Sequence, residues 1–128
     1  MLKKIKIKWL KVPQKHDYPA ARAYLTLLLQ PREAKKLVDK LKYSKVEEFA
    51  AKDIFRAADV PLLPSSDAEV KRNRQLILHK TPLSPLLLYR DPALRRLIIA
   101  DGYHRLCAVY SFDEQSRIPC QIVSTRTL

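Results

Sequence analysis

The sequence predicts a mixed α+β fold, in which a helical first half precedes a half that alternates strands with a helix. Apolar residues recur at helical spacing in several segments before residue 60, whereas residues 85–89 and 97–100 are short continuous apolar runs. Hydrophobic residues make up 47% of the 128 residues and charged residues 30%, a mixture typical of a folded chain rather than a disordered one. We therefore expect one compact unit.

The first half reads as one strand followed by three helices. Lysines alternate with apolar residues from 3 to 12, which predicts a strand with one apolar face. Asp17 is placed to cap a helix, and Pro31 to end it and begin a second, strongly amphipathic helix. Ser44 and Glu47 match the S-x-x-E capping box, which predicts the start of a third helix.

A proline-rich link at residues 60–64 marks the organisational boundary of the chain. It divides a strand-and-helix extension, residues 1–59, from a second unit, residues 60–128, and we expect the two to pack together. Directly after the link, Ser66 and Glu69 form a second capping box, which predicts a fourth helix.

The second half carries strand patterns around a single glycine. The apolar runs at residues 85–89 and 97–100 predict a buried hairpin, because a turn-forming Asp-Pro lies between them. Apolar residues at helical spacing follow Gly102, and residues 117–123 regain strand character. The only glycine of the chain thus stands where a strand turns into a helix, in the stretch LIIADGYHRL.

Gly102 has a structural and a functional interpretation. A sharp turn can need the positive φ that glycine adopts without strain, and this alone explains the residue. A helix start also presents free N–H groups to an anion such as phosphate. Helical geometry directs Arg105 away from the core and sets His104 on the flank, so both can reach that anion. Asp101 can cap the helix, orient one of these cations or bind magnesium.

The charge balance favours anionic partners. Lysine and arginine outnumber aspartate and glutamate by 25 to 13, which gives a formal net charge of +12 and a field that attracts nucleotides and nucleic acids. Without interleaved aromatic residues, such lysines imply only salt-sensitive, sequence-independent contacts with phosphates. The candidate nucleic-acid contacts are Lys4, Lys6, Lys8, Lys71, Arg72 and Arg74.

Other function classes find little support. The three histidines are scattered, without acidic or cysteine neighbours at a metal-ligand spacing, so we expect no dedicated metal site. Cys107 and Cys120 lie inside apolar segments, so we expect both to be reduced and structural. No apolar run approaches the roughly 20 residues that span a bilayer, so we expect a cytoplasmic protein without a membrane partner.

The stretch IIADGYHRLCAVY, followed by IPCQIV, resembles the ParB/sulfiredoxin superfamily over about residues 60–123. That superfamily includes CTP-binding partition proteins, sulfiredoxins and ParB-like serine kinases. The resemblance implies a small mixed sheet with helices, and a turn that binds nucleotide phosphates. The implied phosphate-binding residues are Asp101, Gly102, Tyr103, His104 and Arg105.

The residues around the turn allow this sequence to be compared with each of these members of the superfamily. Sulfiredoxins carry a catalytic cysteine where Tyr103 stands, which argues against repair of sulfinic acids. Partition proteins carry Gly-Glu-Arg-Arg and continue into a helix-turn-helix domain, whereas this turn reads GYHR and the chain ends at Leu128, which argues against sequence-specific partition. The motif DGYHR most resembles the DGHHR motif of the serine kinases, in which an acidic residue upstream of the motif serves as the base. The acidic residues available upstream in this sequence are Asp67 and Glu69.

These observations predict that the protein binds the phosphates of a nucleotide or nucleic acid at residues 101–105. One alternative is a small nucleotide-dependent enzyme, a kinase or nucleotide hydrolase, with Asp101, His104 and Glu69 as candidate catalytic residues. The other is a protein that binds DNA or RNA without sequence preference through its basic surface. The expected cofactor is CTP, ATP or ADP with Mg²⁺, and the sequence leaves open whether the chain forms a homodimer.

Overall fold

The computed structural model describes residues 5–124, which form five helices and a four-stranded mixed sheet. The elements are α1 (Asp17–Leu25), α2 (Pro31–Lys42), β1 (Glu47–Ala50), α3 (Ala51–Ala58), α4 (Ala68–Leu78), β2 (Leu86–Asp91), β3 (Arg96–Asp101), α5 (Tyr103–Phe112) and β4 (Arg117–Ser124). The strand order is β1-β4-β2-β3; β2 and β4 are parallel, and the other neighbouring pairs are antiparallel. This architecture confirms the predicted mixed α+β fold.

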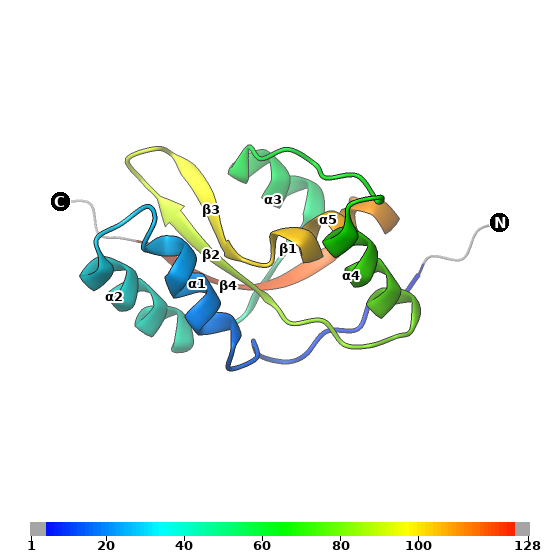
Figure 1. Cartoon of the computed structure of the whole chain (residues 1–128), viewed down its shortest axis with the longest axis horizontal. Helices are drawn as coiled ribbons and strands as arrows, with labels where there is room; N and C mark the ends of the chain where they lie inside the picture. The colour runs from blue at the N-terminus through cyan, green and yellow to red at the C-terminus, as the bar shows by residue number, and fades with distance from the viewer. Residues whose placement is uncertain (1–4, 125–128) are drawn as a thin grey trace.

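Helices cover both faces of the sheet, and alternation along the strands supplies an apolar cluster to each face. Leu86 and Leu88 of β2 belong to the cluster with α3, α4 and α5, whereas Leu87 and Tyr89 belong to the cluster with α1 and α2. Figure 1 shows these two groups of helices on opposite sides of β2. Because both of its faces are covered, β2 reads as a continuous apolar run.

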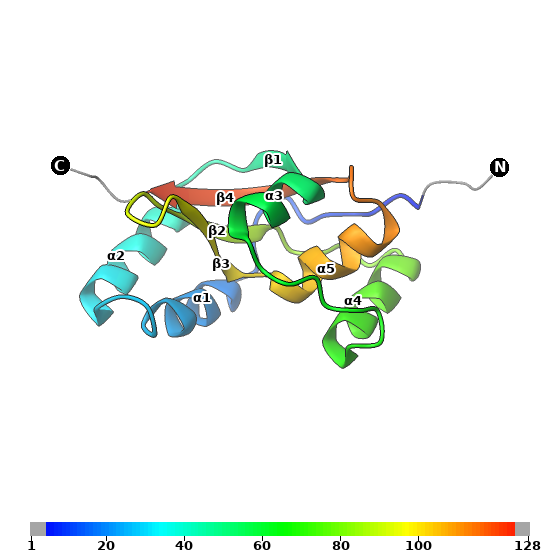
Figure 2. The ribbon, with the colours of Figure 1, turned by 90° about the horizontal axis from the view of Figure 1, so that it is seen from above.

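Both halves of the chain build this sheet. β1, which precedes the proline-rich link, pairs antiparallel with β4, so that Phe49 lies opposite Ile118. At the other edge of the sheet, α1 packs against β3. From β3 the chain passes through α5 to β4, and α4 lies on the far side of α5 from the strands (Figure 2).

The strand predicted for the N-terminal segment is wrong for the described residues. Residues 5–12 form only one isolated bridge, in which Trp9 lies parallel to Leu83. The backbone N–H of Leu10 donates to the Leu83 carbonyl, and that of Leu83 donates to the Lys8 carbonyl, each at 2.8 Å. Prolines at positions 82 and 85 lack the N–H groups that would extend the ladder, so the segment stays extended but unpaired on either side of the bridge.

The capping box predicted at Ser44 does not open a helix. The hydroxyl of Ser44 donates to the Lys40 carbonyl at 3.0 Å, at the end of α2, and the Ser44 carbonyl accepts a hydrogen bond from the side chain of Gln121. Glu47–Ala50 then form β1, and the third helix begins only at Ala51. Pairing with β4 therefore outweighs a favourable local helix signal.

The capping box predicted at Ser66 is displaced by one residue. Asp67 is the N-cap of α4, and its Oδ1 accepts hydrogen bonds from the N–H groups of Glu69 at 3.0 Å and Val70 at 3.1 Å. The helix itself is where the sequence predicts it. A carboxylate at this position also lies favourably at the positive end of the helix dipole.

Replacement of the true cap should destabilise the fold, whereas replacement of its neighbour should not. We expect Asp67→Ala to lower the free energy of unfolding by about 1 kcal/mol, because two N–H groups of α4 lose their acceptor. Ser66→Ala is the matched control and should leave that free energy within about 0.5 kcal/mol of the wild type. Urea denaturation followed by circular dichroism measures both, and equal losses in the two variants would contradict the assignment of the cap.

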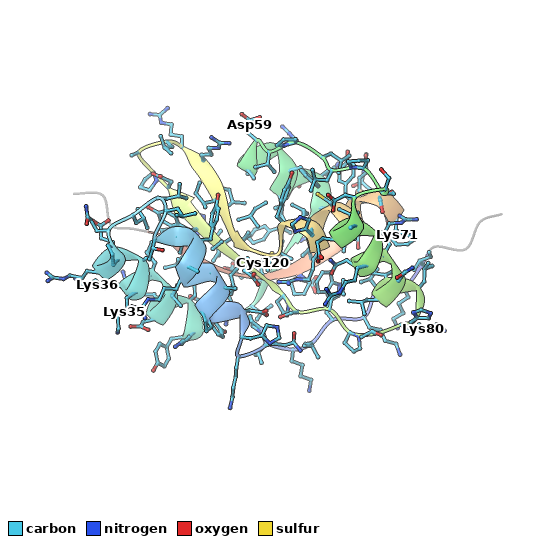
Figure 3. All side chains as sticks on the ribbon, viewed as in Figure 1. Lys35, Lys36, Asp59, Lys71, Lys80 and Cys120 are labelled. Atoms are coloured by element: carbon cyan, nitrogen blue, oxygen red, sulfur yellow. The ribbon has the colours of Figure 1, made fainter. Side chains whose placement is uncertain are left out.

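Both cysteines are buried, as the sequence predicts. Cys107 and Cys120 are buried and form no disulfide, and burial raises the pKa of the Cys120 thiol to about 12. Figure 3 shows Cys120 at the centre of the molecule. Among residues 5–124, no helix is both long enough and apolar enough to cross a membrane.

Candidate phosphate-binding site

The turn between β3 and α5 requires glycine for two reasons. Gly102 has φ +112° and ψ 15°, in the region that side chains rarely adopt. A Cβ atom there would lie 2.8 Å from Cγ of Leu86 and 2.9 Å from a terminal guanidinium nitrogen of Arg105. The structural interpretation of the glycine is therefore confirmed, and the close approach of Arg105 belongs to the same geometry.

No side chain caps the start of α5. The N–H of Leu106 donates to the Gly102 carbonyl at 2.9 Å, which is the first hydrogen bond of the helix, and the N–H groups of the preceding residues point out of its end. The interpretation of Asp101 as the cap is wrong, because its carboxylate turns to Arg105 instead. Among the described residues, no side chain therefore accepts a hydrogen bond from the N–H groups at the positive end of the helix dipole.

Asp101 and Arg105 form a largely buried ion pair. A terminal nitrogen of Arg105 lies 3.1 Å from Oδ2 of Asp101, and their side chains are 16% and 19% exposed, respectively. The same nitrogen also donates to the Pro85 carbonyl at 3.3 Å. Arg105 therefore does not point away from the core as the helical geometry predicts. Its Nε is buried without a hydrogen-bond partner in the described part of the chain.

Two residues missed by the sequence analysis complete this polar cluster. Asp17 and Ser84 are both nearly inaccessible, and the Ser84 hydroxyl donates to Oδ2 of Asp17. The N–H of Gln14 also donates to both side chains, at 3.0 Å to the carboxylate and 3.1 Å to the hydroxyl. Asp17 is thus a buried acceptor at the first position of α1, and its predicted capping role is wrong.

The pKa of Asp101 is raised above its ordinary value. Burial is the largest cause; the positive charge and hydrogen bond of Arg105 oppose it, and the neighbouring carboxyl group of Asp17 adds to it. An acid whose pKa is raised in the folded state binds its proton more tightly there. The ion pair with Arg105 therefore holds the Asp101 charge in place against two unfavourable effects.

A pocket of about 290 Å³ opens over this turn, and it is called the turn pocket below. Its walls come from the segment before α1, from α4 and from the loop before β2, and all five residues from 101 to 105 line it. α4 contributes Glu69 and Arg72, which form an exposed ion pair at 3.9 Å. The structure thus brings Glu69 to the same pocket as Asp101 and His104, the other two candidate catalytic residues.

Tyr103 is anchored beside the turn pocket. Its hydroxyl donates to the Pro61 carbonyl in the proline-rich link, and burial raises the pKa of that hydroxyl. Its ring lies next to the imidazole of His104, with centroids 5.4 Å apart. Both residues line the turn pocket.

A second pocket, of about 660 Å³, lies on the other side of the turn and is called the link pocket below. It is bounded by α1, by the link after α3 and by β3, and residues 101–104 line both pockets. Tyr24, Val60 and Ile98 are among its mainly apolar lining residues. The turn therefore separates a polar pocket from an apolar one.

The basic residues predicted to contact nucleic acid from the N-terminal segment lie near the end of α4. Lys6 and Lys8 are exposed and line a cavity of about 370 Å³ together with Lys80. Lys4 falls outside the described residues. A patch of positive charge at this place would repel like charges and attract phosphates at low salt.

The three basic residues predicted on α4 point in different directions. Arg72 lines the turn pocket, whereas the guanidinium of Arg74 lies over the ring of Phe112, 4.0 Å from its centroid. Lys71 is exposed, and Figure 3 shows it on α4. The sequence therefore predicts correctly that these three residues lie on one helix. It does not predict that Arg72 lines the turn pocket.

No metal-binding cluster of three or more histidine, cysteine or acidic residues occurs between residues 5 and 124. Comparison with known proteins finds no matching family model, no matching curated protein and no matching solved structure. The candidate site accordingly rests on the geometry of its own residues.

Proposed function

We propose that the protein binds a nucleotide, with the phosphates in the turn pocket at the start of α5. The observation that carries this proposal is the meeting, in one pocket, of an uncapped helix start with Arg72 and His104. A helix N-terminus offers backbone donors and a positive dipole to an anion, and a guanidinium adds a bidentate donor. The resemblance of the DGYHR turn to the ParB/sulfiredoxin superfamily supports the same function.

The residues of the turn would take distinct roles. Arg72 is exposed on α4, where a phosphate would compete with Glu69 for its guanidinium, and His104 can donate one further hydrogen bond. Arg105 acts chiefly as a positioning residue, because its terminal nitrogen already holds Asp101 and the chain at Pro85.

The link pocket fits the apolar part of such a ligand. Tyr24 and Val60 line it, and residues 101–104 are common to both pockets. A nucleotide whose phosphates lie over the turn could therefore place its base against these side chains. An Mg²⁺ ion would arrive with the phosphates, which supply the oxygen ligands that this ion prefers.

The test is a thermal-shift screen against CTP, ATP, ADP and GTP, with and without magnesium. Mass action predicts a rise in Tm on the order of 10 °C when the bound nucleotide is present at roughly 100 times its Kd. Arg72→Gln and His104→Gln should each reduce this rise, since each removes one donor from the pocket.

Arg56→Gln is the matched control for Arg72→Gln. Arg56 forms an exposed i,i+3 pair with Asp53 at 3.7 Å on α3, much as Arg72 does with Glu69, but it does not line the turn pocket. It should keep the full shift. A wild type that no nucleotide stabilises, yet that retards DNA or RNA in a salt-dependent way, would move the function to the basic surface and exclude this proposal.

The position of Glu69 favours one second candidate, a nucleotide-dependent phosphoryl-transfer enzyme. Glu69 shares the turn pocket with Asp101 and His104, so an acid is available opposite the proposed phosphates. Incubation with the stabilising nucleotide, with and without serine, would then release a product that Glu69→Gln abolishes while nucleotide binding persists. Stable nucleotide over the same incubation leaves binding as the function.

A further inference from the structure

A third pocket lies on the sheet away from the turn. It has a volume of about 650 Å³, it is bounded by α3, β1, the end of β4 and the β2–β3 hairpin, and it shares no lining residue with the turn pocket. We call it the hairpin pocket. Figure 1 shows α3 and the tip of the hairpin along the same edge of the molecule.

The floor of the hairpin pocket is apolar because of strand alternation. Leu88 and Ile122 point to this face from the two central strands, and Ile54 and Ala57 face them from α3. α3 ends at Ala58, where the next residue takes a left-handed conformation and the chain turns away. No helix therefore covers the ends of the strands beyond it.

Three arginines line the pocket beside this apolar floor: Arg90, Arg95 and Arg96. Arg96 is fixed by hydrogen bonds to the backbone carbonyls of Ala58 at 3.0 Å and Asp59 at 3.1 Å. Arg90 donates to the Ser124 hydroxyl at 3.4 Å. Within residues 5–124, none of the three arginines forms an ion pair with a carboxylate.

The two acidic residues of the hairpin pocket are already engaged elsewhere. Asp53 pairs with Arg56 at 3.7 Å. Oδ1 of Asp91 accepts hydrogen bonds from the N–H groups of Ala93 and Leu94 in the hairpin turn. The pocket consequently combines an apolar floor with three arginines against two aspartates, a formal excess of one positive charge.

We propose that the hairpin pocket binds a small amphipathic carboxylate, with an aliphatic body on the apolar floor and its carboxylate at Arg90 and Arg95. The volume lies within the range of small-molecule sites, and apolar walls with a few charged groups are typical of such sites. Guanidinium groups pair well with carboxylates. This proposal does not rest on nucleotide binding at the turn, although Arg96 and Leu97 line both the hairpin pocket and the link pocket.

The test is a titration of the full chain with octanoate, 1-octanol and octylammonium, below their aggregation concentrations, followed by backbone-amide NMR. These three probes share the aliphatic body and differ in charge. Octanoate should shift the amides of Ala57, Leu88 and Ile122, and should bind at least about threefold more tightly than 1-octanol, with octylammonium the weakest.

Two variants separate the apolar from the charged contribution. Ala57→Phe fills the pocket and should abolish binding of all three probes. Arg90→Gln combined with Arg95→Asn should reduce octanoate affinity to that of 1-octanol, and asparagine tolerates the positive φ of +51° at position 95. The matched control removes two exposed charges from α2, by Arg32→Gln with Lys36→Gln, and should bind octanoate like the wild type.

Several outcomes would overturn the proposal. Equal affinities for the three probes would remove the role of the arginines. Octanoate shifts confined to the link pocket, or undiminished in Ala57→Phe, would place the ligand elsewhere. Loss of octanoate binding in the α2 control would show that net charge alone attracts it. Spectra that superpose away from the pocket verify that each variant is folded.

Discussion

Gly102→Ala is expected to lower the free energy of unfolding by about 2–4 kcal/mol. A side chain at φ +112° costs about 1–2 kcal/mol, and the added methyl group would lie 2.8 Å from Cγ of Leu86, an overpacking that costs a further 1–3 kcal/mol. The same methyl group would crowd the guanidinium of Arg105. Urea denaturation followed by circular dichroism measures the loss.

A double-mutant cycle separates the two costs. Leu86→Ala alone opens a cavity and should be destabilising by about 2–5 kcal/mol. Combined with Gly102→Ala, it also removes the atom that the methyl group would meet, so the loss in the double variant should be smaller than the sum of the single losses. Strictly additive losses would show that the contact with Leu86 does not contribute, which leaves the backbone conformation and the contact with Arg105 as the causes.

Arg105→Met is expected to lower the free energy of unfolding by about 2–4 kcal/mol at mildly alkaline pH. The substitution keeps an apolar side chain of similar length but leaves the largely buried carboxylate of Asp101 without its cation, and such losses are large. The side chains of Arg105 and Asp101 are still 16% and 19% exposed, so the expected loss of free energy is smaller than for a fully buried pair.

This loss should diminish as the pH falls. Burial already raises the pKa of Asp101, and removal of Arg105 raises it further because the opposing positive charge is gone. Below the folded-state pKa of the wild type the carboxyl group is protonated in both proteins, so the electrostatic part of the loss disappears. It is fully present only above the higher folded-state pKa of the variant. Unfolding curves at acidic and mildly alkaline pH measure this difference.

Asp101→Asn combined with Arg105→Met provides the control. Compared with Asp101→Asn alone, in which no group titrates at position 101, the double variant should lose the same free energy of unfolding at both pH values. A single variant whose loss is the same at both pH values would contradict the role of the ion pair. Because Arg105 supports the turn itself, the nucleotide screen relies on Arg72 and His104 instead.

The sequence predicts those elements whose signals are local. Pro31 begins α2 as expected, with the apolar stripe of that helix buried, and the hairpin of β2 and β3 follows the two apolar runs. Gly102 likewise predicts a turn, because no other residue type adopts a positive φ as readily as glycine. These predictions succeed because each depends on neighbours within a few positions.

The failures share the opposite cause. Ser44 begins a favourable capping pattern, yet pairing of the residues after it with β4, far along the chain, decides their conformation. Asp17 looks like a cap, but the buried hydroxyl of Ser84 binds its carboxylate. Glu69 and Arg72 reach the turn pocket only through the packing of α4 on α5. The spacing of residues in the sequence does not predict these contacts.

The pairing of the strands brings together chain segments that are far apart in the sequence. Glu47 pairs with Cys120, and the extended segment at Trp9 pairs with Leu83, so chain segments distant in sequence must meet before the sheet closes. Closing such long loops costs entropy before any contact compensates for it, which slows folding. The walls of the turn pocket come from four separate stretches of chain. The turn pocket therefore forms only when these four stretches have met, because no one of them alone supplies its walls.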